Sequence, residues 1–340
     1  MTTANASTPR KDRRRRYRWA AAAVLLLGSF AAAMVFGAAD TTLRDVWRAL
    51  ATRDTGETLT LIREIRLPRE VAAVLVGSAL AVSGAVMQGM TRNPLADPGL
   101  LGLTAGANAA LAATIAFLPS ASYFAMIIAC FLGAVVGSGL VFGLGAMRKG
   151  GFSPLRLVLA GAAVSAFLYA ISEGIGLAYK ISKDVSMWTA GGLVGTSWEQ
   201  IRLITPFVLV GIVLALLLSR QITILSLSEE AAVGLGQRTA QLKAVLFGLT
   251  IILTGASVAL VGNLTFVGLL IPHIARGIVG TDYRSVIPFS AIAGGAFMML
   301  ADTLSRTINA PYETPVAAIV SMVGLPFFLF VVHKGGKAFS

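Results

Sequence analysis

Three ionisable side chains fall within or at the ends of long apolar runs, where a charge is costly and usually serves a function. They are Glu173, Asp302 and His273. An ion pair with Arg306, one helical turn later, would account for Asp302. Hydrogen bonding to backbone freed by Pro272 would account for His273. Glu173 has no charged partner in reach on its own helix. Proton or ion transfer within a membrane is the chemistry that such groups could do.

The motifs of common enzymes do not accompany these groups. The sequence holds no nucleophile elbow, phosphate-binding loop, HExxH or dinucleotide-binding motif in a context that would confirm it. Its two histidines, His273 and His333, lack zinc-ligand spacing, and the single cysteine, Cys130, lies in an apolar run. We therefore predict a protein that is not an enzyme and that holds no metal or cofactor.

Composition points to a lipid environment. Hydrophobic residues make up 56% of the 340 residues and charged residues 13%, against about 25% charged in a soluble domain. We predict an all-α integral membrane protein in the cell membrane. The net charge of +12 does not indicate nucleic acid, because seven basic residues lie in the first 18 positions, directly before an apolar run. That arrangement is typical of a cytoplasmic flank. A signal peptide is the competing interpretation, but the run 20–39 is long enough to span, which favours a retained helix.

About ten apolar runs are long enough to cross a bilayer core. They lie near 19–39, 70–90, 99–118, 122–147, 155–178, 201–219, 241–262, 265–279, 286–303 and 314–333. An even number with a cytoplasmic N-terminus places the C-terminus in the cytoplasm as well. We thus expect a basic tail, 1–18, followed by a single transmembrane domain, 19–340.

The two halves of the chain echo each other. A shift of 178 residues superposes seven identical residues, five of them Gly or Pro, which fix backbone shape. They are Leu75, Gly77, Ala81, Gly84, Pro94, Gly99 and Gly102 on Leu253, Gly255, Ala259, Gly262, Pro272, Gly277 and Gly280. Because five spans separate the copies, we predict an inverted repeat of halves near 66–178 and 241–333, a common transporter plan.

Polar connections stand out between these spans. A turn with Asn93, Pro94 and Pro98 follows the second span. Between the sixth and seventh spans, Ser228 is a candidate N-cap of a short helix with two acids in its first turn. Such a helix is either a simple connection or a handle for another protein.

The stretch from Arg66 to Gly106 resembles the signature of the FecCD permease family, the membrane subunits of ABC importers for ferric siderophores, haem and cobalamin. Further motifs agree, namely S-E-E-A-A-V-G-L-G (228–236), F-V-G-L-L-I-P-H-I-A-R (266–276), T-D-Y-R (281–284) and A-D-T-L-S-R (301–306). The resemblance implies a ten-span permease paired with a second, identical or related permease chain. It also implies two cytoplasmic ATPase subunits and an extracytoplasmic binding protein.

Ferric siderophores are the cargo that we expect, with haem or cobalamin as alternatives within the family. An ion-coupled secondary transporter using Glu173 or Asp302 is the alternative outside it. The resemblance also implies site residues. On an exposed outer rim, Arg66, Arg69 and Arg306 would dock the binding protein through paired hydrogen bonds to carboxylates; the alternatives are anchoring at the headgroup layer and pairing of Arg306 with Asp302. The cytoplasmic gate would comprise Asn93, Leu95, Ser153, Pro154 and Leu155, and coupling to the ATPase would involve Glu229, Glu230, Gly234, Leu235 and Gly236.

Overall fold

A computed structural model describes the chain except for residues 1–8, 38–40, 147–153, 191, 311 and 336–340. This described part is helical and holds no strand, which confirms the all-α prediction. Its elements in chain order are α1 (Pro9–Val35), α2 (Leu43–Ala51), α3 (Glu57–Leu61), the π-helical η1 (Ile62–Arg66), α4 (Leu67–Thr91), the 3₁₀ helix η2 (Pro98–Leu101), α5 (Leu103–Phe117), α6 (Tyr123–Ala146), α7 (Pro154–Ala178), α8 (Ser182–Thr189), α9 (Trp198–Leu227), α10 (Glu229–Gly234), α11 (Thr239–Val261), α12 (Val267–Val279), α13 (Tyr283–Thr307) and α14 (Val316–Gly335).

Within the described residues, eight helices are long and apolar enough to cross a membrane, and two more, α5 and α12, are apolar but shorter. Together they correspond to the ten predicted spans. The boundaries differ most at α1, which begins at Pro9 and so includes the basic stretch from residue 10, and at α9, which continues to Leu227.

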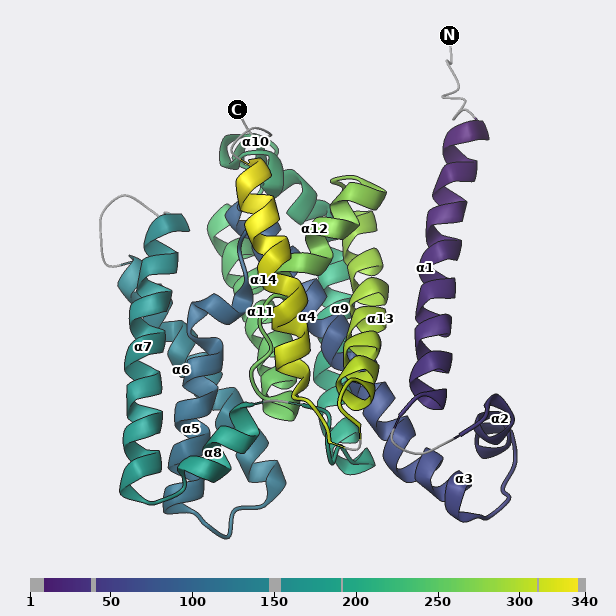
Figure 1. The fold of residues 1–340 in the computed structure, drawn as a ribbon. Helices are drawn as coiled ribbons and strands as arrows, with labels where there is room; N and C mark the ends of the chain where they lie inside the picture. The colour runs from purple at the N-terminus through teal and green to yellow at the C-terminus, as the bar shows by residue number, and fades with distance from the viewer. Residues whose placement is uncertain (1–8, 38–40, 147–153, 191, 311, 336–340) are drawn as a thin grey trace.

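The helix α4 forms the centre of the bundle. Of its apolar window, 83% is buried, against 22% for α1, so α4 is a core helix and α1 a peripheral one. The helices α9, α11, α12 and α13 pack on α4, while α5, α6 and α7 pack on one another. In Figure 1, α1 and the α5–α8 group lie on opposite flanks of this centre. Residues carried by α4 are therefore held by several neighbours.

The bundle has two unlike ends (Figure 1). At one end, here called the α10 end, lie α10, the start of α1 and the last residues of α14. At the opposite end, here called the α3 end, lie α2, α3 and α8. The first and last described helices therefore begin and end on the same side, as an even number of spans requires.

The segment between α1 and α4 has its own small core. Thr42 caps α2 in a reciprocal capping box with Asp45, which satisfies backbone donors at the helix start. Buried Met34, Leu59 and Ile62 meet the buried face of α2. The three short helices in this segment were not predicted, because they are too short to give a spanning signal.

Glycines allow close helix contact along α4. A Cβ atom built on Gly84 would overlap the backbone carbonyl of Gly268 on α12, and one built on Gly77 would overlap that of Gly294 on α13. Small residues let helix backbones approach closely in lipid, where packing rather than hydrophobicity drives association. The contacts join α4 of the first half to α12 and α13 of the second.

The predicted repeat register of 178 residues is wrong. The order of a long, a short and two long helices does recur, as α4–α7 and α11–α14. However, α4 and α11 begin at 67 and 239, whereas α6 and α13 begin at 123 and 283, so the offset shrinks from 172 to 160. A fixed shift therefore places Pro94, in a turn, on Pro272, which lies inside α12. In a chain with 36 glycines, identities of Gly and Pro are frequent and do not by themselves fix a register.

Candidate functional site

At the α3 end, five charged side chains of the described part form a continuous chain of ion pairs, here called the ion chain: Glu313, Arg69, Asp302, Arg306 and Glu70. Arg69 and Glu70 lie in the first turn of α4, where Pro68 suits the helix start. Asp302 and Arg306 lie one turn apart at the end of α13. The ion chain thus joins the start of α4 to the end of α13.

Arg69 is held by two carboxylates. Its Nε donates to Asp302 Oδ2 at 2.9 Å, and its Nη2 donates to Asp302 Oδ1 at 2.9 Å. The same guanidinium donates from Nη1 to Glu313 Oε1 at 2.8 Å and from Nη2 to Glu313 Oε2 at 3.0 Å. Arginine's planar fork suits such paired contacts. Both edges of the Arg69 fork are therefore occupied.

Arg306 continues the ion chain. Its Nη2 donates to Glu70 Oε1, and its Nε lies 3.0 Å from Asp302 Oδ2 without hydrogen-bond geometry. Asp302 and Glu70 are fully buried, so their charges depend on these partners. Among the described residues, Glu70 Oε2 has no hydrogen-bond partner. The i,i+4 pairing considered for Asp302 is confirmed, and Arg69 adds to it.

Arg66 and Arg306 also bind the end of α1. Arg66 Nη1 donates to Met34 O at 2.6 Å and to Val35 O at 3.2 Å, and Arg306 Nη2 donates to Ala33 O at 3.2 Å. The last carbonyls of a helix lack intrahelical donors and carry partial negative charge. The two arginines therefore fasten the peripheral α1 to the core at the α3 end.

The structure thus brings Arg66, Arg69 and Arg306 together, but not as an exposed rim. The three residues are 4–6% exposed, so that part of the expectation is wrong. Burial follows from their partners, which lie up to 244 residues away in the chain. Sequence reasoning missed Glu70 and Glu313 as those partners; Glu313 could have been suspected as the one acid between the last two apolar runs.

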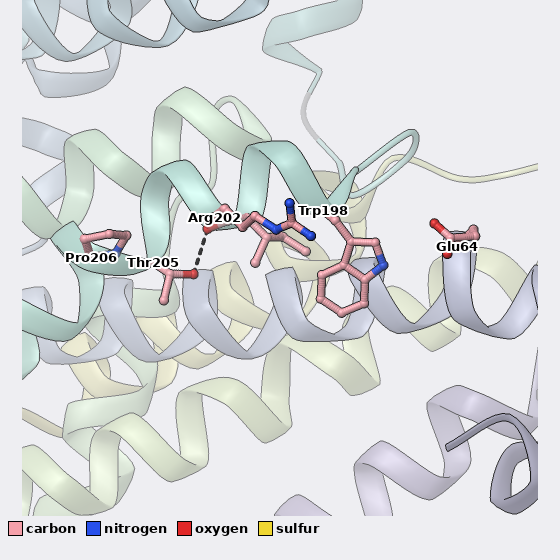
Figure 2. Close-up of a pocket in the computed structure, with 6 residues that line it drawn as sticks. Glu64, Trp198, Arg202, Thr205 and Pro206 are labelled. Atoms are coloured by element: carbon pink, nitrogen blue, oxygen red, sulfur yellow. Dashed lines mark hydrogen bonds between the residues drawn. The ribbon is translucent and has the colours of Figure 1, made fainter. Parts of the chain in front are cut away.

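An open cavity of about 700 Å³ lies at the same end, between η1 and the start of α9 (Figure 2). Its lining residues are Glu64, Trp198, Ile201, Arg202, Thr205 and Pro206. The Trp198 ring lies between Arg202 and Glu64, and its Nε1 donates to Arg63 O at 3.1 Å. Glu64 and Arg202 are exposed. Because water reaches both charges, this cavity is a weaker candidate for specific recognition than the ion chain.

At the α10 end, α4 ends in the polar turn predicted from Asn93. Arg92 adopts a left-handed conformation, with φ of 53°, and closes the helix. Asn93 Oδ1 accepts a hydrogen bond from the Leu95 backbone N–H at 3.0 Å, a local turn typical of asparagine. Ser153, the other part of the predicted gate, lies outside the described residues. Pro154 and Leu155 begin α7, and their side chains are not described.

Gln88 connects this turn to α12. Its Nε2 donates to Gly268 O at 3.1 Å and to Ala96 O at 3.3 Å, and its Oε1 accepts from Arg276 Nη1 at 2.5 Å. Gly268 is four residues before Pro272, so its carbonyl has no helical donor. Gln88 therefore satisfies the backbone that the proline frees.

The expectation that His273 would do so is wrong. Its Nδ1 is buried and, within the described part of the chain, has no hydrogen-bond partner. The ring instead meets Phe327 edge to face, with centroids 5.5 Å apart. Glu173 lies exposed on α7.

The short helix α10 forms as predicted, with the Ser228 side chain accepting from the Ala231 N–H at 3.0 Å. Glu229 binds Lys243 Nζ at 2.7 Å and lies 3.5 Å from Arg92 Nη2. The hydrogen bond from Lys243 lowers the pKa of Glu229 below its usual value. These pairs tie α10 to α11 and to the end of α4.

The remaining predicted coupling residues lie on or beside α10. Glu230 follows Glu229, and Gly234 is the last helical residue. Gly236 has a φ of 81°, which suits glycine after a helix. Leu235 between them is 68% exposed. A single exposed apolar side chain is common, whereas a contiguous apolar patch indicates a contact site. Val233 and Leu227 are also exposed near Leu235, so the three residues are a candidate contact patch.

The structure is that of a multi-pass α-helical membrane protein. Its helices of spanning length surround the core helix α4, with the ion chain at one end and the capped helix α10 at the other. Residues 25–334 match the FecCD transport family, and the chain belongs to this family. The resemblance predicted from the motifs is thereby confirmed.

Curated relatives match most of the chain. The iron(3+)-hydroxamate import system permease protein FhuB of Bacillus subtilis (strain 168) is 44% identical over 92% of this chain and 81% of its own. The hemin transport system permease protein HmuU of Yersinia pestis is 38% identical over 92% of each chain. The ferric enterobactin transport system permease protein FepD of Escherichia coli (strain K12) is 35% identical over 92% of this chain and 93% of its own.

Solved structures share the fold. An inward-facing conformation of a metal-chelate type ABC transporter superposes with a TM-score of 0.82 at 26% identity, over 94% of this chain and 99% of that chain. PsaBC from Streptococcus pneumoniae in complex with Fab superposes with a TM-score of 0.61 at 18% identity, over 80% and 92%. The second similarity shows the fold alone.

Proposed function

We propose that this chain is the membrane-spanning subunit of an ATP-driven importer for ferric siderophores, those of the hydroxamate type first. The observation that carries the proposal is the 44% identity to an iron(3+)-hydroxamate permease over 92% of the chain. Haem is the second candidate, because a hemin permease is 38% identical over the same share. Cobalamin remains the third, on the family resemblance alone.

The partners that we propose follow from the class. Two ATPase subunits would bind the α10 end. We propose that this end is cytoplasmic, and the arginine-rich stretch before the first span supports that orientation. A second permease chain, identical or related, would complete the translocation path. A binding protein would deliver the chelate at the α3 end. The permease itself would not hydrolyse ATP, since the separate ATPase subunits would supply the energy.

We propose a role for each candidate site. The surface around Arg66, Arg69 and Arg306 would receive acidic side chains of the binding protein. Asn93 and Leu95, with the segment from Ser153 to Leu155, would narrow the path at its cytoplasmic end. The surface helix with Glu229, Glu230, Gly234, Leu235 and Gly236 would seat in a groove of the ATPase. Charge, turn geometry and exposed apolar surface support these roles in turn.

Uptake of radio-iron chelates tests the proposed cargo. Cells with and without the gene would receive a ferric hydroxamate, a ferric catecholate, ferric citrate and haem in parallel, and labelled cobalamin separately. We expect the gene to increase uptake of the ferric hydroxamate most. If the two strains take up every ferric chelate equally but differ in uptake of haem or cobalamin, the siderophore proposal is replaced by the alternative that differs.

A further inference from the structure

Glu313 differs from the other members of the ion chain in its exposure. Its side chain is 35% exposed, whereas those of Arg69, Asp302, Arg306 and Glu70 are between 0% and 8% exposed. It lies in the loop between α13 and α14, where the Thr314 backbone N–H donates to Ser305 O at 3.0 Å. Glu313 is thus the member that faces the surface on which a partner would arrive.

Glu313 holds Arg69 as a docking carboxylate would. Its two oxygens accept from Nη1 and Nη2 at 2.8 and 3.0 Å, the paired geometry in which arginine recognises a carboxylate. Asp302 accepts from Nε and Nη2 on the buried side. While Glu313 stays in place, the outward edge of Arg69 is not available to another carboxylate.

The contacts of Arg69 show what the departure of Glu313 would leave. Asp302 would still accept from Nε and Nη2 of Arg69, but Nη1 would lose Glu313 Oε1, the acceptor that it has among the described residues. Arg69 is 6% exposed, and a buried donor without an acceptor is unfavourable. The site would therefore favour a replacement carboxylate over an empty position.

We propose that Glu313 is an internal competitor: it occupies Arg69 in the resting permease, and a carboxylate of the binding protein displaces it on docking. The exchange changes the free energy little. Arg69 keeps a paired carboxylate throughout, and Glu313 moves from a partly exposed position into water. This inference rests on the proposed docking role of Arg69. It adds that the free permease lowers its own affinity for its partner.

Replacement of Glu313 by glutamine tests the competition. Docking of the importer's purified binding protein to the full permease–ATPase complex in lipid nanodiscs would be measured at low salt. We expect Glu313→Gln to tighten docking about two- to fivefold, the affinity equivalent of one partly exposed ion pair. Glu199→Gln is the matched control, because Glu199 is an exposed acid in the first turn of α9 and belongs to no described ion pair. It removes the same charge from the same end, and its effect gives the long-range electrostatic contribution.

Thermal unfolding of the same variants separates competition from a structural role. We expect Glu313→Gln to lower the melting temperature while tightening docking, and Glu199→Gln to leave the melting temperature nearly unchanged. Docking by Glu313→Gln no tighter than by Glu199→Gln would overturn the inference.

Variants at Arg69 distinguish that result from failure of the docking role itself. Arg69→Lys keeps the charge and loses the fork, and Arg69→Gln loses both. If folded Arg69→Lys docks weakly while Glu313→Gln docks no tighter than its control, the proposed docking role of Arg69 stands and the proposed competition by Glu313 is rejected. Normal docking by both Arg69 variants would reject the docking role and the competitor with it.

Discussion

Buried polar side chains serve this protein as links between helices that are far apart in the chain. Arg69 of α4 holds Asp302 of α13, and Arg306 of α13 holds Glu70 of α4 and the end of α1. Each guanidinium in the ion chain has more than one acceptor, which offsets the cost of taking its charge out of water. Removing one partner would leave the other charge buried, at a cost of about 3–5 kcal/mol.

Gln88 links in the same way without a charge, and we expect Gln88→Leu to destabilise the permease. The leucine would remove the Gln88 partner of the Gly268 carbonyl and of Arg276 Nη1, and each buried unsatisfied group costs about 1–3 kcal/mol. Gln237→Leu is the control, because Gln237 donates only one described hydrogen bond, to Gln221 O. Thermal unfolding in detergent measures both. Equal melting temperatures for the two variants would show that the Gln88 contacts contribute little.

At the scale of helices, backbone contact sets where α4 meets its neighbours, and two glycine substitutions should act in opposite directions. We expect Gly84→Ala to destabilise the bundle, because its Cβ would overlap the Gly268 carbonyl. Gly248→Ala in α11 would find no atom within 4 Å and should stabilise by about 0.5–1 kcal/mol, since alanine favours a helix over glycine. Melting temperatures that move in the same direction would contradict the packing argument.

The turn after α4 carries the gate prediction. Asn93 fixes the turn by accepting from the Leu95 N–H, and Pro94 and Pro98 limit its backbone. We expect Asn93→Ala combined with Leu95→Gly to raise passive leak through reconstituted permease without ATP. Efflux of a small fluorescent solute from proteoliposomes measures the leak. Efflux at the wild-type rate would place the narrowing elsewhere.

The helix α10 carries the coupling prediction. Its salt bridges from Glu229 to Lys243 and Arg92 anchor it, while Leu235 stays exposed. We expect Leu235→Arg to reduce transport and binding-protein-stimulated ATP hydrolysis several-fold while the permease remains folded. Leu235→Met is the control, because it keeps an apolar side chain of similar volume at the same position and should leave stimulation intact. Full stimulation in the Leu235→Arg complex would reject the assignment.

At the scale of the whole molecule, the sequence predicted what depends on the length of apolar runs. The ten apolar helices, their even number and the capped helix at Ser228 were predictable because each signal is local. The ion chain was not, because its pairs join residues 233 and 244 positions apart, and the arginines alone suggested an exposed rim. The repeat register failed since insertions between helices change the offset. Glycine identities within helices cannot reveal such insertions.

The placement of the intramembrane acids argues against an ion-coupled carrier. Asp302 is fully buried and pairs with both Arg69 and Arg306, which gives it a structural role in the ion chain. Glu173 is the other acid that the sequence suggested for such a carrier, and it is exposed on α7.

We therefore expect Glu173→Gln to retain at least half of wild-type uptake. We also expect uptake in whole cells to continue after a protonophore is added, while ATP lasts, and to stop when ATP is depleted. Uptake of a radio-iron chelate measures all three results: the effect of Glu173→Gln, of the protonophore and of ATP depletion. The cellular ATP concentration is measured in the same samples. Immediate arrest by the protonophore at constant ATP, together with loss of uptake in Glu173→Gln, would identify proton coupling through Glu173 instead. Arrest with wild-type uptake in the variant would leave Glu173 without a role in energy coupling, because a carrier that needs its proton cannot work with an amide in that position.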